Sequence, residues 1–113
     1  MYEGGGYTMK DPIHVLMIED KKAGYWSAQC LEYDIATQAK GLTALLDEVH
    51  RVLNAHIRLS EKLKIEPFAN LKSAPPIFWK MYYRATTSVH HISSVETLTN
   101  APVEGRVAEL QLC

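Results

Sequence analysis

Four acidic residues in the first third of the chain are of the type that binds metal ions in metal-dependent hydrolases: Glu19, Asp20, Glu32 and Asp34. A two-metal nuclease needs several acidic side chains that converge on ions about 4 Å apart. Here the first two acids fall in a predicted hairpin loop, and the other two fall at the end of a predicted strand. Charged residues in such places are usually solvated. We therefore interpret all four as turn residues, and we keep a metal-dependent nuclease or other hydrolase as an alternative hypothesis.

The histidines and cysteines offer less chemistry than the carboxylates. His14 interrupts an otherwise apolar stretch, Ile13 to Ile18, with no cysteine or acid at the spacing of a zinc site. We interpret it as a hydrogen-bonded structural histidine, with metal ligation as the alternative. Cys30 and Cys113 make neither a zinc spacing nor a CxxC motif, so we expect two reduced thiols. The sequence thus predicts a protein without catalytic residues, metal or cofactor, and not an enzyme.

Length and composition describe one small domain. The chain has 113 residues, of which 47% are hydrophobic, and this is enough to form a core. Twelve basic and thirteen acidic residues give a formal charge of −1, so the domain is a poor candidate for binding the polyphosphate backbone of a nucleic acid. No apolar run has the length of a membrane span, and the first residues lack the order of a secretory signal. We expect a cytoplasmic protein whose residues 1–12 form a flexible lead-in.

Three strands and a long helix are predicted in residues 13–63, the expected core of the domain. Apolar residues fill 13–18, and residues 25–31 alternate so that Trp26, Ala28 and Cys30 share one face of a strand. Residues 35–39 form the third strand. Apolar side chains then recur at three- and four-residue steps, which predicts an amphipathic helix with Thr43 as its N-cap. The apolar stripe comprises Leu42, Leu45, Leu46, Val49, Val52, Leu53 and Ile57.

The second half of the chain, residues 64–113, is predicted to contain a short helix and a last strand. Residues 73–86 have proline in the first helical turn and apolar side chains on every side. A short helix of this kind in a small domain indicates a partner or oligomer interface, with burial in the core and base stacking as alternative uses of its aromatics. Residues 106–112 alternate as an edge strand would, while 86–105 show no clear pattern. The predicted interface residues are Phe78, Trp79, Tyr82 and Tyr83.

These elements predict an α+β fold in a single domain, residues 1–113. We expect a small antiparallel sheet of three to four strands in β-β-β-α-β order. One long amphipathic helix should pack on this sheet, accompanied by a second short helix.

The string GYWSAQCLEYDIATQAKGLT, Gly24 to Thr43, together with the hairpin before it and the helix after it, resembles the HicB-like antitoxin domain family. The features that carry the resemblance are Trp26 and Ala28 in strand two, the strand over residues 35–39, the turn over residues 41–43 and the helix from Ala44. The similarity covers residues 13–57. It implies a partial ribonuclease-H-like fold that binds and silences a small basic RNA-cleaving toxin of the HicA type, as a dimer or tetramer. The sheet edge and the aromatic segment would cover the toxin's RNA-binding face.

Two departures from the family pattern limit what the resemblance implies. Position 46 is leucine where the family often has an acid that completes a capping box with the threonine. Many members also carry a C-terminal DNA-binding segment, but the basic residues here are too few and scattered for a groove-reading face, so we do not expect direct DNA binding. The leading hypothesis is an antitoxin, and the alternative is an orphan homo-oligomeric scaffold without a toxin. The basic residues in question are Lys72, Lys80, Arg84 and Arg106.

Overall fold

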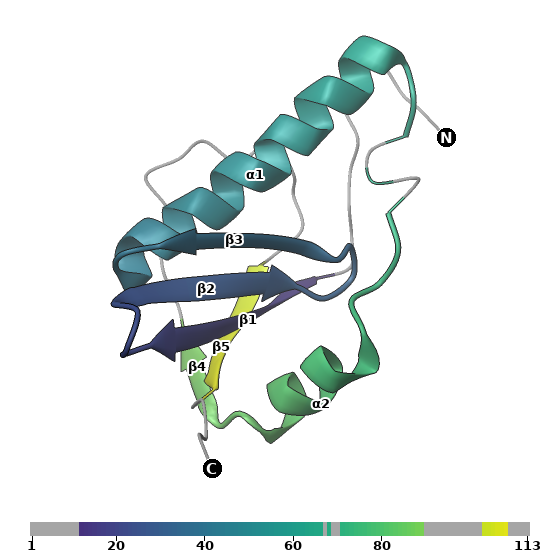
Figure 1. Ribbon diagram of the computed structural model, residues 1–113. Helices are drawn as coiled ribbons and strands as arrows, with labels where there is room; N and C mark the ends of the chain where they lie inside the picture. The colour runs from purple at the N-terminus through teal and green to yellow at the C-terminus, as the bar shows by residue number, and fades with distance from the viewer. Residues whose placement is uncertain (1–11, 67, 69–70, 90–102, 109–113) are drawn as a thin grey trace.

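The computed structural model describes residues 12–66, 68, 71–89 and 103–108 (Figure 1). Most of the predicted lead-in, residues 1–11, therefore lies outside the described residues. The described part of the chain holds no helix that is long and apolar enough to cross a membrane. Its elements are β1 (Ile13–Asp20), β2 (Tyr25–Cys30), β3 (Ile35–Ala39), α1 (Leu42–Leu63), α2 (Pro76–Arg84), β4 (Thr87–Val89) and β5 (Val103–Ala108).

The described strands form one mixed sheet in the order β3-β2-β1-β5-β4. The α+β class and the β-β-β-α order agree with the prediction, but the sheet has five strands and β5 runs parallel to β1. The expectation of a purely antiparallel sheet was therefore wrong. β1 is apolar on both faces, as an interior strand must be, and it pairs with β2 on one side and with β5 on the other.

β5 differs most from its predicted counterpart. It begins at Val103 rather than at residue 106, and it lies inside the sheet between β1 and β4 rather than at the edge. Gly105 explains why the sequence did not reveal this strand, because glycine is depleted in strands. A Cβ atom at Gly105 would meet the terminal methyl group of the buried Met17 side chain on β1, so a larger residue here would displace that side chain. Residues 109–113 lie outside the described residues.

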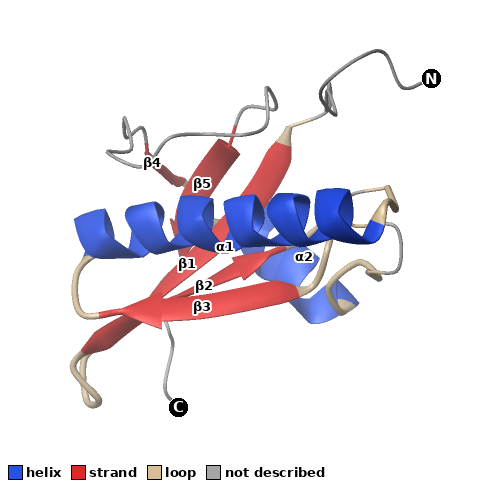
Figure 2. Ribbon diagram, turned by 90° about the horizontal axis from the view of Figure 1, so that it is seen from above, coloured by secondary structure: helices blue, strands red, loops and turns tan. Residues whose placement is uncertain are grey.

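The two helices cover opposite faces of the sheet (Figure 2). Alternate residues of β1 supply each face: Val15 and Met17 are buried in the cluster beneath α1, and Leu16 is buried in the cluster beneath α2. Ala28 and Cys30 of β2 belong to the α1 cluster, with Trp26 packed against it, as their shared face predicted. Because of this division, α2 packs only on the sheet side chains of the Leu16 face.

α1 has the predicted apolar stripe but not the predicted cap. Gly41 is the N-cap residue, without a side-chain cap hydrogen bond, and the helix begins at Leu42, so the assignment of Thr43 was wrong. The helix ends at Leu63, where Lys64 takes a left-handed conformation with a φ of 57°. The buried members of the stripe are Leu45, Leu46, Val49, Leu53 and Ile57.

Candidate partner-binding site

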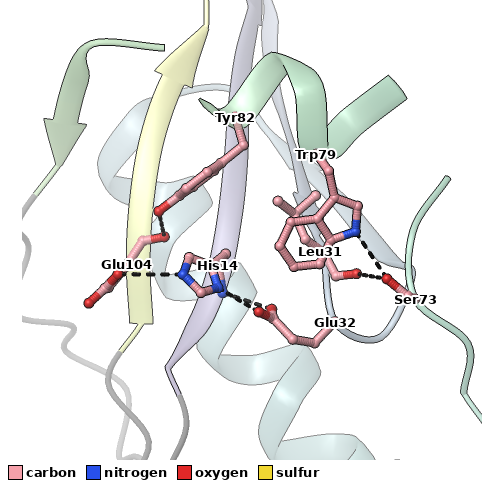
Figure 3. Close-up of polar contacts among 7 residues, drawn as sticks. All are labelled: His14, Leu31, Glu32, Ser73, Trp79, Tyr82 and Glu104. Atoms are coloured by element: carbon pink, nitrogen blue, oxygen red, sulfur yellow. Dashed lines mark hydrogen bonds and ion pairs between the residues drawn. The ribbon is translucent and has the colours of Figure 1, made fainter. Parts of the chain in front are cut away.

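His14 is the centre of a polar cluster between β1, β5, the β2–β3 turn and α2 (Figure 3). Its Nδ1 lies 2.5 Å from Oε2 of Glu32, and its main-chain N–H donates to Oε1 of the same carboxylate at 2.8 Å. Because an ionised carboxylate only accepts hydrogen bonds, Nδ1–H is the donor of this pair. On the other side of the ring, Nε2 lies 3.6 Å from Oε2 of Glu104. One imidazole thus stands between two carboxylates.

The backbone explains why these three residues meet. His14 points to the α2 face because strand residues alternate, and the parallel register of β1 and β5 places it opposite Glu104. Glu32 follows β2 in a turn whose first residue, Leu31, donates its N–H to the carbonyl of His14 at 2.9 Å. The side chains of His14 and Glu32 are 24% and 23% exposed, and that of Glu104 is 57% exposed. Glu104 is therefore the carboxylate most open to an incoming group.

Tyr82 and Trp79 of α2 lie against the imidazole. The Tyr82 ring meets His14 edge-on with centroids 5.2 Å apart, and the Trp79 ring centroid lies 5.9 Å away. The Tyr82 hydroxyl donates to the carbonyl of Glu104 at 3.2 Å. Arg106 places its guanidinium 4.6 Å from the centre of the Tyr82 ring and donates to the Tyr82 carbonyl at 3.2 Å. These contacts fix α2 to β5.

The chain segment before α2 is also held in place. Trp79 donates its indole N–H to Oγ of Ser73 at 3.0 Å, and that hydroxyl donates to the carbonyl of Leu31 at 3.0 Å. The N–H of Ala74 donates to the same carbonyl at 2.8 Å. The Leu31 carbonyl, at the end of β2, thus anchors both the indole and the backbone that leads into α2.

Burial controls the acidity of two groups near the cluster. Burial raises the pKa of the Tyr82 hydroxyl; the Arg106 charge opposes this shift, and the Glu104 charge adds to it. Burial, with a further contribution from the Glu32 charge, raises the pKa of the Cys30 thiol to about 12. Cys30 also packs in the cluster beneath α1, on the opposite face from His14. It is therefore a protonated core residue at neutral pH and lacks the thiolate that a nucleophile needs.

The four carboxylates singled out in the sequence do not form one site. Glu19 and Asp20 lie at one end of β2 and Glu32 and Asp34 at the other, and six strand residues separate the pairs by about 20 Å. The prediction of a hairpin loop for Glu19 and Asp20 was wrong, because both end strand β1. Asp20 accepts the N–H of Ala23 at 2.9 Å, and Asp34 accepts from the Gln29 amide at 2.8 Å. The interpretation of Glu32 as a solvated turn residue missed its pairing with His14. Within the described ranges, no group of three or more His, Cys, Asp or Glu side chains is placed to hold a metal ion.

The predicted interface residues of α2 divide between the core and the surface. Tyr82 is 2% exposed and belongs to the core of the monomer, while Phe78 and Trp79 are partly buried against it. Tyr83 is 66% exposed and stacks on Trp79, with ring centroids 6.1 Å apart. Ile77, which the sequence reasoning did not select, is 58% exposed. The 100° step of the helix could have separated these positions once one inward residue was known.

Comparison of the chain with protein-family models, with curated proteins and with solved structures gave no match. The resemblance to HicB-like antitoxins therefore stays a prediction from residues 13–57, and the chemistry of the site has to be judged from its geometry. In that geometry, the group that faces Nε2 of His14 is a carboxylate rather than a hydroxyl or a thiol. Among the described residues, the structure places no hydroxyl or thiol at the second nitrogen of His14, so these residues do not assemble a catalytic triad. The exposed carboxylate of Glu104 instead suits the binding of a cationic side chain.

Proposed function

We propose that this protein is a non-enzymatic HicB-like antitoxin that binds and neutralises a small basic RNA-cleaving toxin by protein–protein association. The observation that carries the proposal is the acidic row formed by Glu32 and Glu104 on the two sides of His14, whose ring centroid lies 5.9 Å from that of Trp79. Glu104 is 57% exposed, and its recorded ionic neighbour, His14, stands 3.6 Å away. This carboxylate is thus available to an arginine or lysine of a partner.

The acidic row matches the charge of the proposed partner. A toxin that binds RNA carries lysine and arginine on its binding face, and carboxylates that meet this face would both steer the encounter and compete with RNA phosphates. Arginine binds a carboxylate through two parallel hydrogen bonds, so the exposed Glu104 offers it a matching contact. The anchored Trp79 side chain needs little further ordering when a partner docks.

The order of elements agrees with what the resemblance implies. Three consecutive strands precede one long helix, and the turn over residues 41–43 stands where that helix begins. The small sheet carries α1 across one face, which leaves the other face to α2 and the acidic row. The proposed toxin surface therefore lies on the face of the sheet opposite α1.

Affinity capture of the tagged protein from its source cells, followed by mass spectrometry, tests the proposal. We expect a small basic protein to be recovered whose expression alone arrests growth and cleaves RNA, and whose activity this chain suppresses. Glu104→Lys should weaken both capture and suppression. Glu61→Lys, which makes the same charge change at an exposed site on the last turn of α1, is the matched control and should retain both.

Other results of the same experiment would contradict the proposal. Recovery of the chain alone as a stable homo-oligomer, with no effect of Glu104→Lys on its state, would replace the antitoxin with the orphan scaffold. A captured partner that is not basic, or that binds Glu104→Lys and the parent chain equally well, would contradict the role of the acidic row.

A further inference from the structure

The outer face of α2, defined as Ile77, Lys80, Tyr83 and Arg84, combines apolar and cationic side chains. Ile77 is 58% and Tyr83 is 66% exposed, and both cations are also exposed. The spacing of three, three and one residues places all four on the side of the helix that points away from the buried Tyr82. Two large apolar groups thus flank two positive charges on one solvent-facing stripe.

The charges on this face are not balanced by acids nearby in the chain. The sequence as a whole has thirteen acidic and twelve basic residues, yet no aspartate or glutamate occurs between Glu66 and Glu96. Among the described residues, the ion pairs involve His14 and Arg51, and neither Lys80 nor Arg84 takes part in one. The outer face of α2 is therefore a local excess of positive charge on a chain that is slightly acidic overall.

The inner side of the same helix is firmly held. Tyr82 is 2% exposed, donates its hydroxyl to the carbonyl of Glu104 at 3.2 Å, and accepts from Arg106 at its own carbonyl. Trp79, which stacks on Tyr83, is tied through Ser73 to the end of β2. The outer face is thus presented on a fixed scaffold, and binding to it requires little ordering of the backbone.

We propose that the outer face of α2 is a docking surface for an acidic peptide segment that carries apolar side chains. Carboxylates of such a segment pair with Lys80 and Arg84, and its apolar side chains cover Ile77 and Tyr83, which removes exposed apolar area from water. A basic toxin is repelled by these cations and meets the acidic row instead. The two surfaces therefore serve different partners, and each proposal can fail without the other.

The chemistry favours a peptide over single-stranded nucleic acid. Two cations on the face, with Lys72 in the segment before α2, neutralise few phosphates, and phosphate neutralisation supplies most of the affinity for a nucleic acid backbone. Isoleucine gives a base no ring on which to stack, whereas it contributes directly to a peptide interface. An acidic and apolar segment uses all four side chains of the face.

Fluorescence anisotropy with the full chain tests this proposal. The probe is a fluorescein-labelled peptide with glutamate and leucine at helical spacing, compared with the same peptide carrying lysine for glutamate and with labelled oligouridine. We expect the acidic peptide to bind the parent chain. The paired change Lys80→Glu and Arg84→Glu should weaken this binding at least tenfold, and Tyr83→Ala should weaken it several-fold. The paired change Arg58→Glu and Lys62→Glu, at exposed cations of α1, is the matched control and should alter binding less than twofold. Circular dichroism verifies that each variant is folded.

Three results would overturn the proposal. In the first, the lysine peptide binds as tightly as the acidic peptide, or the paired change Lys80→Glu and Arg84→Glu leaves binding of the acidic peptide unchanged. A second is oligouridine binding tighter than the peptide and lost in the same paired variant, which would assign the face to nucleic acid. The third is absence of peptide binding together with self-association of the chain, detected by sedimentation, that Tyr83→Ala abolishes. That result would assign the face to a second copy of this chain.

Discussion

Replacement of Glu32 by alanine removes both oxygens that hold His14. One accepts the main-chain N–H of His14 at 2.8 Å, and the other lies 2.5 Å from Nδ1. A hydrogen bond to a charged group contributes about 1.5–3 kcal/mol, so the two bonds set an upper value of about 3–6 kcal/mol. The Glu32 side chain is 23% exposed, and water replaces part of this interaction. We expect Glu32→Ala to lower the free energy of unfolding by about 2–3 kcal/mol.

Urea denaturation monitored by circular dichroism measures this loss as a shift of the midpoint at constant slope. Glu32→Gln should lose less, about 1 kcal/mol, because the amide oxygen still accepts the main-chain N–H of His14. Asp34→Asn is the matched control from the same turn: Asp34 is exposed, and asparagine tolerates its positive φ of 33°. This control should change the free energy of unfolding by less than about 0.5 kcal/mol.

A double-mutant cycle with His14→Ala assigns the energy to the pair. The coupling between the two substitutions should reach about 1–2 kcal/mol, because the residues share one hydrogen-bonded contact. Additive losses, or a Glu32→Ala variant no less stable than Asp34→Asn, would refute the reasoning. Glu32 would then be the solvated turn residue that the sequence indicated.

Three further predictions follow from burial. Tyr82→Ala should lower the free energy of unfolding by about 3–5 kcal/mol in urea denaturation, because Tyr82 is buried. Tyr83→Ala should change the same free energy by less than about 0.5 kcal/mol, because Tyr83 is exposed. Equal losses in the two variants would contradict the placement of α2. In a Cys113→Ser background, Cys30 should resist thiol reagents until the protein unfolds. Because its folded pKa of about 12 exceeds the ordinary 9.0, the thiol's contribution to stability is present below pH 9 and falls by about 1.4 kcal/mol per pH unit between pH 9 and about 12, so Cys30→Ala should show a shallower alkaline loss of stability. Gly105→Val should lower the urea midpoint, since the added side chain would displace the buried methyl group of Met17, and an unchanged midpoint would show that the Met17 side chain moves aside without cost.

Local periodicity was sufficient to predict much of the fold. The stripe of α1 and the alternation of Trp26, Ala28 and Cys30 each repeat with the period of their element, so a window of a few residues identifies both the element and its buried face. Proline in the first turn likewise marked the start of α2. β4 and β5 were missed or misplaced because a three-residue strand and a strand with a central glycine carry little periodic signal.

The sequence also indicated most members of the candidate site, but not Glu104, which lies in the stretch 86–105 that shows no clear pattern. His14 was conspicuous as a polar residue in an apolar strand, Glu32 as an acid at a strand end, and the α2 aromatics as a cluster. What the sequence determined by itself, therefore, was which residues break or follow a local pattern. Such patterns depend on neighbours within one helix turn or one strand, and they are legible without the rest of the chain.

The tertiary structure alone decided which of these residues meet. His14 contacts an acid 18 residues away through the β1–β2 register and faces Glu104 because β5 returns parallel to β1. The tertiary structure also decided that Tyr82 is a core residue and Tyr83 a surface residue, because their burial depends on which side of α2 rests on the sheet. Strand pairing and helix docking bring together residues that are distant in the chain. No local pattern in the sequence records these contacts, because their geometry exists only once the sheet has formed.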